Sequence, residues 1–203
     1  TNVRTGSKGP IAHCRGPGTA LAKSAKQSSI AQREGVVKPV LLIGCGGHAK
    51  SVIDLIEAEG KWQIRGMVGL REQVGSSVLG YEVIGTDDDL PKLRKDCQSA
   101  ILAIGQIPSP EPRMRLAAQL EQLEMSFPVV ISPNAIVSRY TRLGAGTVVG
   151  HGAVLNADAV VGTHCTINTR AVIEHDVKLG DHCHVSTGAV INGGVHVGSG
   201  SFI

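Results

Sequence analysis

Aromatic residues are scarce in this chain, whose 203 residues include one Trp, two Tyr and two Phe. A core built around large rings is therefore excluded. Glycine is abundant, with 26 residues, and aliphatic side chains supply most of the apolar mass. Such a composition requires small side chains packed in a regular way, and the length allows one large domain or two small ones.

Long hydrophobic runs and paired cysteines are also missing. No apolar run reaches the length that spans a membrane, so we expect no membrane partner. The cysteines are odd in number and form no CxxC pair: Cys14, Cys45, Cys97, Cys165 and Cys183. This pattern argues against a disulfide framework and predicts a reducing, cytoplasmic location.

Positive charge is concentrated at the N-terminus. Residues 1–38 hold seven Lys or Arg and a single acid, Glu34, whereas the rest of the chain is slightly acidic. A basic patch for nucleic acid would have to lie on a folded part, and none is expected there. The composition of residues 1–38 predicts a flexible tail without catalytic function, and this segment lacks the apolar core of a secretory signal.

Residues 39–128 alternate short apolar runs with amphipathic segments. Val40–Ile43 reads as a buried strand, and a glycine-rich turn follows it. Apolar positions at helical spacing then run from Ala49 to Ala58, and Gly60 closes them. We expect further strands in QIRGMVG, YEVIG, SAILAIG and SFPVVIS, and helices in DDDLPKLRKDC and PEPRMRLAAQLEQLEM. The alternation predicts an α/β domain with a small parallel, Rossmann-like sheet.

A six-residue period starts near residue 129. Thirteen positions spaced by six carry an aliphatic side chain: Ile131, Val137, Leu143, Val149, Leu155, Val161, Ile167, Ile173, Leu179, Val185, Ile191, Val197 and Ile203. The position four residues after each of the first twelve holds Ala, Thr, Cys, Val or Ser. Two registers with one period predict a left-handed parallel β-helix of hexapeptide repeats over residues 129–203, with three hexads to a coil.

Glycine recurs within this repeat every 18 residues, at Gly144, Gly162, Gly180 and Gly198. We expect these glycines at turns that need unusual backbone dihedrals. The repeat is still running at Ile203. We therefore expect the β-helix to be cut short there, with part of a site on further coils, and the sequence does not say whether the given coils suffice for activity.

Three histidines lie close together in the stretch EHDVKLGDHCHVSTG, namely His175, His182 and His184. The hexad register places all three outside the core, and His182 lies one coil beyond His164, so these two rings should stack. A zinc site like that of gamma-class carbonic anhydrases needs two histidines five residues apart. No such pair exists between His151 and the C-terminus, so no metal is expected.

His175 stands between two carboxylates, Glu174 and Asp176. A neighbouring carboxylate orients an imidazole and raises its basicity, which suits a general base near neutral pH. The competing interpretation is a polar turn with three solvated side chains. From the residues alone, both interpretations stay open.

The glycine-rich turn GCGGH follows a strand and precedes a helix. Backbone N–H groups and a helix N-terminus at such a turn form a cradle for a phosphate. A dinucleotide fingerprint would need a third glycine, which is missing near Lys50 or Ser51, and the sheet is short for that fold. A nucleotide-sugar diphosphate fits better, and a tight packing turn remains the alternative.

The combination of GCGGHAKSVIDLI with a hexapeptide repeat that contains VIEHDVKLGDHCHVSTGAVINGGV resembles the bacterial NeuD/PglD-type sugar acyltransferases, over residues 39–203. The resemblance implies transfer of an acetyl group from acetyl-CoA to an amino group of a UDP-linked amino sugar. O-acetylation of sialic acid or a related sugar is the alternative. It also implies a homotrimer with acetyl-CoA in the cleft between neighbouring subunits.

The resemblance also assigns roles to residues of the repeat. His175 matches the family's catalytic base, and Asp176 takes the place of the acid that orients it. His184 matches the histidine that contacts acetyl-CoA, near Gly193 on the next coil. A non-catalytic protein that binds nucleotide sugars on the same fold is the alternative from another class, because a fold alone does not establish activity.

In the first domain the resemblance implies a nucleotide site. The matching residues are Gly46, Gly47 and His48 in the turn and a second nucleotide-contacting glycine, Gly105. The family often has an Asp pair after the second strand that faces uridine. This chain has Gly69 and Leu70 there, and the effect of this replacement stays open, as does the identity of the sugar.

Overall fold

The computed structural model of the chain describes residues 37–107 and 109–203, which belong to one compact unit. The predicted flexible tail of residues 1–38 lies outside the described residues, apart from Val37 and Lys38. Lys38 already opens the first strand. Within the described ranges, no helix combines the length and the apolar character needed to cross a bilayer.

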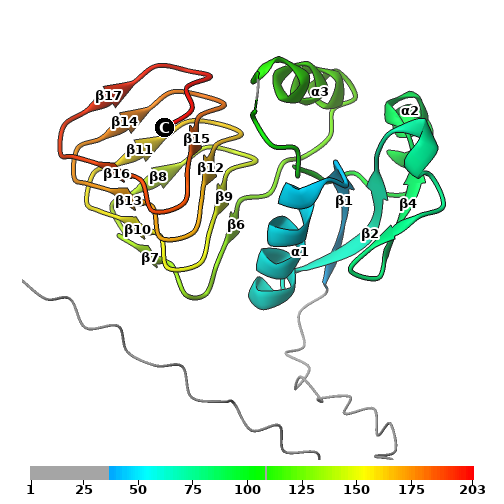
Figure 1. The fold of residues 1–203 in the computed structure, drawn as a ribbon, viewed down its shortest axis with the longest axis horizontal. Helices are drawn as coiled ribbons and strands as arrows, with labels where there is room; N and C mark the ends of the chain where they lie inside the picture. Colours follow the sequence, from blue (N-terminus) through cyan, green and yellow to red (C-terminus); the bar gives the residue numbers. More distant parts are fainter. Residues whose placement is uncertain (1–36, 108) are drawn as a thin grey trace, which may run out of the picture. The chain divides into compact units, whose positions relative to one another are not determined.

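The N-terminal elements form an α/β domain (Figure 1). In chain order they are β1 (Lys38–Ile43), α1 (Gly47–Glu59), β2 (Trp62–Val68), η1 (Arg71–Gln73), β3 (Ser77–Val78), β4 (Tyr81–Gly85), η2 (Asp87–Asp89), α2 (Leu90–Leu93), β5 (Ala100–Leu102) and α3 (Glu111–Gln122). The sheet order is β3-β4-β2-β1-β5. Four strands are parallel, as predicted, but β3 pairs antiparallel with β4. The two-residue turn Leu79–Gly80, with positive φ at both residues, sends the chain straight back.

Helices cover both faces of this sheet because β1 alternates its side chains between two cores. Val40 and Leu42 pack with Val52 and Ile56 of α1. Leu41 and Ile43 lie in a second cluster with residues of α2 and α3. Helix α1 ends where the sequence predicts, at Gly60, which has φ 68° and donates its N–H to the Ile56 carbonyl at 3.0 Å.

The stretch SFPVVIS does not form the predicted last strand of this sheet. Ser126 makes one isolated bridge with Ser99, and β6 (Val130–Ile131) then pairs with a strand of the repeat. Pro128 has no N–H to extend a ladder, so the pairing stops after that bridge. Val130 already follows the hexad register.

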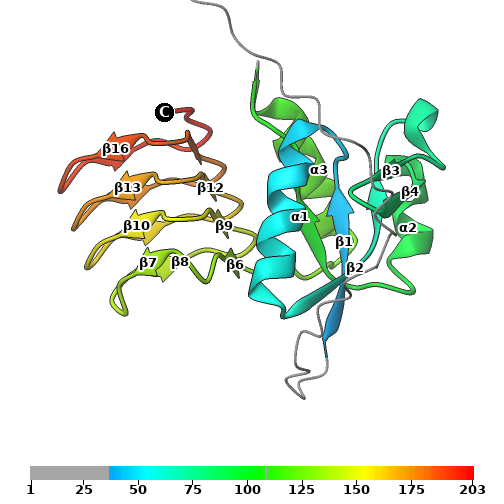
Figure 2. The same cartoon turned by 60° about the horizontal axis from the view of Figure 1, so that its bottom comes forward.

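The remaining strands form the predicted β-helix: β7 (Ile136–Val137), β8 (Arg142–Leu143), β9 (Val148–Val149), β10 (Val154–Leu155), β11 (Val160–Val161), β12 (Thr166–Ile167), β13 (Val172–Ile173), β14 (Lys178–Leu179), β15 (His184–Val185), β16 (Val190–Ile191) and β17 (His196–Val197). Every third strand joins the same parallel sheet, which gives three sheets of four strands. Figure 2 shows one of these sheets as a stack from β7 to β16. The aliphatic residue of each hexad points into the common core.

The prediction that the glycines spaced by 18 residues adopt unusual backbone dihedrals is wrong. Positive φ recurs every six residues, at Gly146, Gly152, Asp158, His164, Arg170, Asp176, His182, Gly188, Gly194 and Gly200. The glycines spaced by 18 are not among them. A Cβ on Gly144 would lie 2.4 Å from the carbonyl carbon of Gly162, and one on Gly180 would lie 2.5 Å from Ser199 Oγ. These glycines are needed because stacked coils approach closely, whereas Gly198 on the last coil meets nothing within 4 Å.

The three sheets present different outer faces. The domain-facing sheet (β6, β9, β12, β15) contributes Val130 and Val148 to the core under α1. The aliphatic sheet (β7, β10, β13, β16) carries a ladder of paired outward residues, Ile136, Val154, Val172 and Val190. Ile136 is 67% exposed and Val190 is 59% exposed. The charged sheet (β8, β11, β14, β17) carries Arg142, Val160, Lys178 and His196 at the equivalent positions.

Candidate active site in two parts

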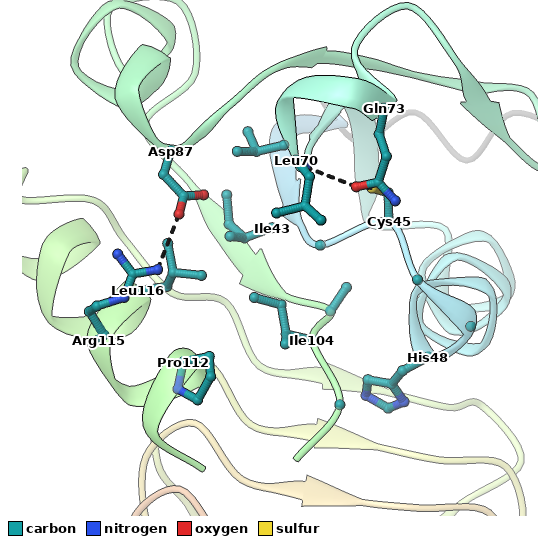
Figure 3. Close-up of a pocket in the computed structure, with 17 residues that line it drawn as sticks. Ile43, Cys45, His48, Leu70, Gln73, Asp87, Ile104, Pro112, Arg115 and Leu116 are labelled. Carbon is teal, nitrogen blue, oxygen red and sulfur yellow. Dashed lines mark hydrogen bonds and ion pairs between the residues drawn. The ribbon is translucent and has the colours of Figure 1, made fainter. Parts of the chain in front are cut away.

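A cavity of about 460 Å³ lies at the carboxyl ends of β1, β2 and β5 (Figure 3). The N-terminus of α1 and the first turns of α3 complete its walls. Strands β1 and β5 are neighbours although α1, α2 and three strands separate them in sequence, so the connections diverge at this point. Open α/β sheets bind ligands at such a position.

The N-terminus of α1 opens into this cavity without a side-chain cap. A Cβ on Gly46 or Gly47 would meet nothing within 4 Å, so neither glycine is required by packing within the chain. Gly44 differs, because it has φ 109° and a Cβ there would lie 2.6 Å from Ile104 Cγ1. The free N–H groups of the first helical turn and the absence of side chains at positions 46 and 47 suit close approach of an anion. Gly105, the other predicted glycine, also lines the cavity with open space at its Cβ position.

His48 lies at the edge of the cavity next to the β-helix. Its ring centroid is 5.6 Å from that of His184 on β15. Burial, and then the nearby Arg113 guanidinium, lower the pKa of His48 to about 4. His48 is therefore neutral near pH 7, and its Nε2 has no hydrogen-bond partner among the described residues.

Arg113 is fully buried between α3 and the domain-facing sheet. In the described part of the chain, nothing accepts a hydrogen bond from its guanidinium nitrogens. Burial lowers the pKa of Arg113 to about 10. Its positive charge contributes to lowering the pKa of His164, His182 and His184, after burial in each case. The interior between the two domains thus keeps its histidines uncharged.

The predicted stacking of His182 on His164 is confirmed, with ring centroids 5.2 Å apart and planes within 9°. His184 lies outside the β-helix core, as the register predicts, but it is not exposed to solvent. His184 is only 6% exposed, and it packs between His48 and Phe202, whose ring centroid is 4.9 Å away. It points outward from the coil, but the α/β domain covers that face. Burial lowers the pKa of His184 to about 4.

His175 lies in a contrasting environment, in the exposed turn between β13 and β14. Asp176 Oδ2 accepts a hydrogen bond from its Nδ1 at 2.8 Å. This hydrogen bond is the main cause that raises the pKa of His175 above its usual value. Since an ionised carboxylate only accepts, Nδ1 carries the proton and Nε2 of the neutral ring is free to take one.

The surroundings of His175 explain two neighbouring residues. Glu174 Oε2 accepts a hydrogen bond from Asn156 Nδ2 at 2.9 Å, so only one of the two flanking carboxylates holds the imidazole. Gly193 stacks on His175 from the next coil, where a Cβ would lie 2.6 Å from His175 Nε2. Gly193 was expected near His184, but the structure brings it against His175.

The cavity and His175 lie on different sides of the β-helix. The domain-facing sheet carries His184 next to His48, at the edge of the cavity. The turn that holds His175 joins the other two sheets, so it occupies the corner opposite that face (Figure 1). One chain therefore brings together Gly46, Gly47, His48 and Gly105, with His184 adjacent, and separately His175, Asp176 and Gly193.

Within residues 37–107 and 109–203, no group of three His, Cys, Asp or Glu side chains gathers as a metal ion would need. Arg113 was not among the predicted site residues, although the sequence holds a signal for it. Arg113, Leu116, Ala117 and Leu120 form the buried face of α3, so an arginine occupies an apolar position of that predicted helix. Gln106 was not predicted either; its Nε2 donates to the Gly200 carbonyl at 2.8 Å and ties the cavity loop to the last coil.

Comparisons with known proteins agree with this architecture. The PglD N-terminal domain family matches residues 39–120, and the bacterial transferase hexapeptide family matches residues 158–193. No curated sequence matches closely enough to add a relative.

Among solved structures, perosamine N-acetyltransferase from Caulobacter crescentus, an Asn-for-His mutant in complex with CoA and GDP-perosamine, is 36% identical with a TM-score of 0.76. The match covers 82% of this chain and 77% of that one. The acetyltransferase domain of PglB from Neisseria gonorrhoeae, in complex with acetyl coenzyme A, is 30% identical with a TM-score of 0.70, over 81% of this chain and 87% of that one. WeeI from Acinetobacter baumannii shares the fold at 18% identity, with a TM-score of 0.63 over 82% and 91% of the two chains. With both halves of the architecture matched in this way, the chain belongs to the PglD-type sugar acyltransferases, enzymes that join a small α/β domain to a hexapeptide β-helix.

Proposed function

We propose that the chain transfers the acetyl group of acetyl-CoA to the amino group of a nucleoside-diphosphate-linked amino sugar. The observation that carries this proposal is the uncapped N-terminus of α1, with Gly46 and Gly47, which opens into the cavity and suits a diphosphate. Two relatives support it, one with CoA and GDP-perosamine and one with acetyl coenzyme A. The uridine nucleotide expected from the sequence stays a prediction, as does O-acetylation as the alternative reaction.

In the proposed mechanism, the sugar nitrogen attacks the thioester carbonyl carbon directly, without a covalent enzyme intermediate. His175 Nε2 accepts the proton that the amine loses, and Asp176 stabilises the imidazolium through the hydrogen bond to Nδ1. A backbone N–H near the coil turn stabilises the oxyanion. The tetrahedral intermediate collapses to the amide as the carbon–sulfur bond breaks, and coenzyme A leaves as thiolate, which takes up the proton.

We further propose a homotrimer in which His175 of one subunit completes the cavity of its neighbour. Two observations support it. One chain keeps His175 on the corner opposite the face next to its own cavity. The ladder from Ile136 to Val190 leaves an aliphatic surface directly beside that corner. Cyclic closure would bury such a surface in each subunit. The contact of His184 with acetyl-CoA stays a prediction, as does a cytoplasmic location.

The reaction is tested by following release of the coenzyme A thiol with acetyl-CoA and a panel of nucleoside-diphosphate amino sugars. Acetylation of an amino sugar, identified by mass spectrometry, is expected. Thiol release with hydroxyl acceptors alone would favour the O-acetyl alternative. No release with any acceptor, although acetyl-CoA binds, would contradict the proposed acceptor class.

The trimer is tested with Val172→Arg, which places charge in the middle of the aliphatic ladder. Sedimentation equilibrium should show a trimer for the parent chain and a monomer for this variant. Activity should fall by at least about tenfold if burial of this surface drives assembly. Val74→Arg, the same change at an exposed site of the α/β domain, is the matched control and should stay trimeric. A parent chain that is a monomer with full activity would contradict the shared site.

A further inference from the structure

The cavity at the carboxyl ends of the strands continues, on the side away from His48, into a second chamber. This chamber has a volume of about 260 Å³ and shares Gly69, Leu70, Asp87 and Arg115 with the first cavity. Figure 3 shows Asp87 and Arg115 at the end of the cavity away from His48. A nucleotide whose diphosphate lies at the N-terminus of α1 would therefore extend its base toward Asp87 and Arg115.

The end of β2 cannot supply a carboxylate to this base. A Cβ on Gly69 would lie 2.4 Å from Cys45 Sγ and 3.0 Å from Gln73 Oε1, so an aspartate does not fit there. Leu70 is 63% exposed, and its N–H already donates to Gln73 Oε1 at 2.9 Å. This edge of the cavity is an aliphatic surface on which the face of a base can lie, and it offers no acceptor of the kind that the Asp pair provides.

The charged groups that line the chamber are Arg71, Asp87, Asp88 and Arg115, and of these only Asp87 of η2 and Arg115 of α3 also line the first cavity. Arg115 Nη2 lies 3.4 Å from Asp87 Oδ2, and both side chains are partly solvated, at 66% and 36% exposure. An exposed pair at this distance is weak, so a ligand can replace it. Gln119 Nε2 donates to the Asp87 backbone carbonyl at 3.2 Å and fixes the turn that presents the carboxylate. The chamber thus places the Asp87 carboxylate, which can accept two hydrogen bonds, beside the Arg115 guanidinium, which can donate two.

We propose that Asp87 and Arg115 read a guanine base, an inference that rests on the proposed function because it identifies the nucleotide of the same substrate. Guanine presents two adjacent donors, N1–H and the 2-amino group, next to the acceptors O6 and N7. The Asp87 carboxylate accepts from the two donors, and the Arg115 guanidinium donates to the acceptors. Uracil presents one N–H between two carbonyl oxygens, and those oxygens would face the carboxylate.

Calorimetric titration with GDP, IDP and UDP tests this assignment without requiring turnover. IDP differs from GDP only in lacking the 2-amino group. We expect GDP to bind at least about tenfold more tightly than UDP, with IDP in between. Asp87→Asn should weaken GDP by roughly 10- to 100-fold and bring the affinities for GDP and IDP close together.

Asp88→Asn is the matched control, since it removes the same charge from the neighbouring residue of η2, which lines the second chamber but not the first cavity. It should keep the preference for GDP, and thermal unfolding checks that both variants are folded. The assignment is overturned if UDP binds as tightly as GDP, or if Asp88→Asn rather than Asp87→Asn abolishes the preference. In either case a nucleotide still binds and the proposed function stands. If none of the three nucleotides binds, the proposed acceptor class fails together with this inference.

Discussion

The two sides of the β-helix place the same residue type in opposite electrostatic settings. On the side that faces the α/β domain, burial and the Arg113 charge lower the pKa of His184 to about 4. On the opposite corner, the hydrogen bond that His175 donates to Asp176 raises the pKa of His175. In the hexapeptide sequence these histidines look alike, nine residues apart. What separates them is the face of the coil on which each lies, which decides whether a histidine is kept neutral or prepared to take a proton.

The two sides of the β-helix also hold different parts of the proposed site. The cavity supplies free helix N–H groups and walls but no base, because its histidine, His48, has its pKa lowered to about 4. The corner supplies a base but no enclosing walls, since the His175 side chain is 66% exposed. Each half lacks what the other has.

The largest effect is expected from His175→Ala. Removing a positioned general base should lower kcat/KM by about 10²- to 10⁴-fold, because the carboxylates that remain at the corner are much weaker bases than an imidazole. Initial rates at saturating acetyl-CoA measure it. His196→Ala, at an exposed position of the charged sheet, is the control and should leave the rate nearly unchanged. If His175→Ala retains most of its kcat/KM, the proposed base is wrong.

The second-largest effect on activity is expected when two inactive variants are mixed. Gly47→Asp puts a carboxylate at the start of α1, where a Cβ has open space, so the chain should fold but repel a diphosphate. In random trimers of equal parts Gly47→Asp and His175→Ala, each site combines the cavity of one subunit with His175 of the next. About a quarter of the sites are then intact, and activity should recover to about a quarter of the parent value. No recovery in verified mixed trimers would mean that the cavity and His175 act within one chain.

The repeat made one half of the molecule far more predictable than the other. A hexad pattern fixes which side chains point inward, so the register from Ile131 to Ile203 could be read without any structure. The reason why glycine recurs every 18 residues could not be predicted in the same way, because the close stacking at Gly144 depends on a residue 18 positions away. The stacking of His182 on His164 followed from the same count.

The α/β domain was predictable in its elements but not in its contacts. The helix from Gly47 to Glu59 and its Gly60 cap follow from local pattern. That the domain covers His184, and that Arg113 points into the resulting interior, depends on packing between segments distant in sequence. The sequence therefore indicated the type of each candidate residue, while its burial and its proton affinity came only with the fold.

A pH titration of stability separates the two sides. Below pH 6.5 His184 is protonated in the unfolded chain, whereas in the folded chain it becomes protonated only near pH 4. Stability should thus rise with pH between about 4 and 6.5, and fall by up to about 3 kcal/mol for His184 alone as the pH drops through that window. Urea unfolding at pH 7 and pH 4 measures it. His184→Asn should reduce the slope without abolishing it, because the pKa of the buried His48 is also lowered to about 4. The exposed His196→Asn is the control, and equal slopes for both variants would show that the buried face does not hold His184 neutral.

The smallest effect is expected from Asp176→Asn, and it tests the other side. The amide still accepts the Nδ1 hydrogen bond but loses its charge, so the pKa of His175 should fall from its raised value toward the ordinary one. Because the neutral ring is the base, kcat/KM rises with pH through this pKa, and the midpoint of the acidic limb should therefore move to lower pH. The plateau rate should fall by about tenfold, since the imidazolium formed during transfer loses its carboxylate partner. Glu174→Gln is the matched control, because the Glu174 carboxylate pairs with Asn156 instead. Its plateau should stay, and its midpoint should move less than in Asp176→Asn, because the Glu174 charge is the smallest of the causes that raise the pKa of His175. A midpoint that moves as far as in Asp176→Asn would show that the general charge of the turn, and not the hydrogen bond at 2.8 Å, sets the basicity of His175.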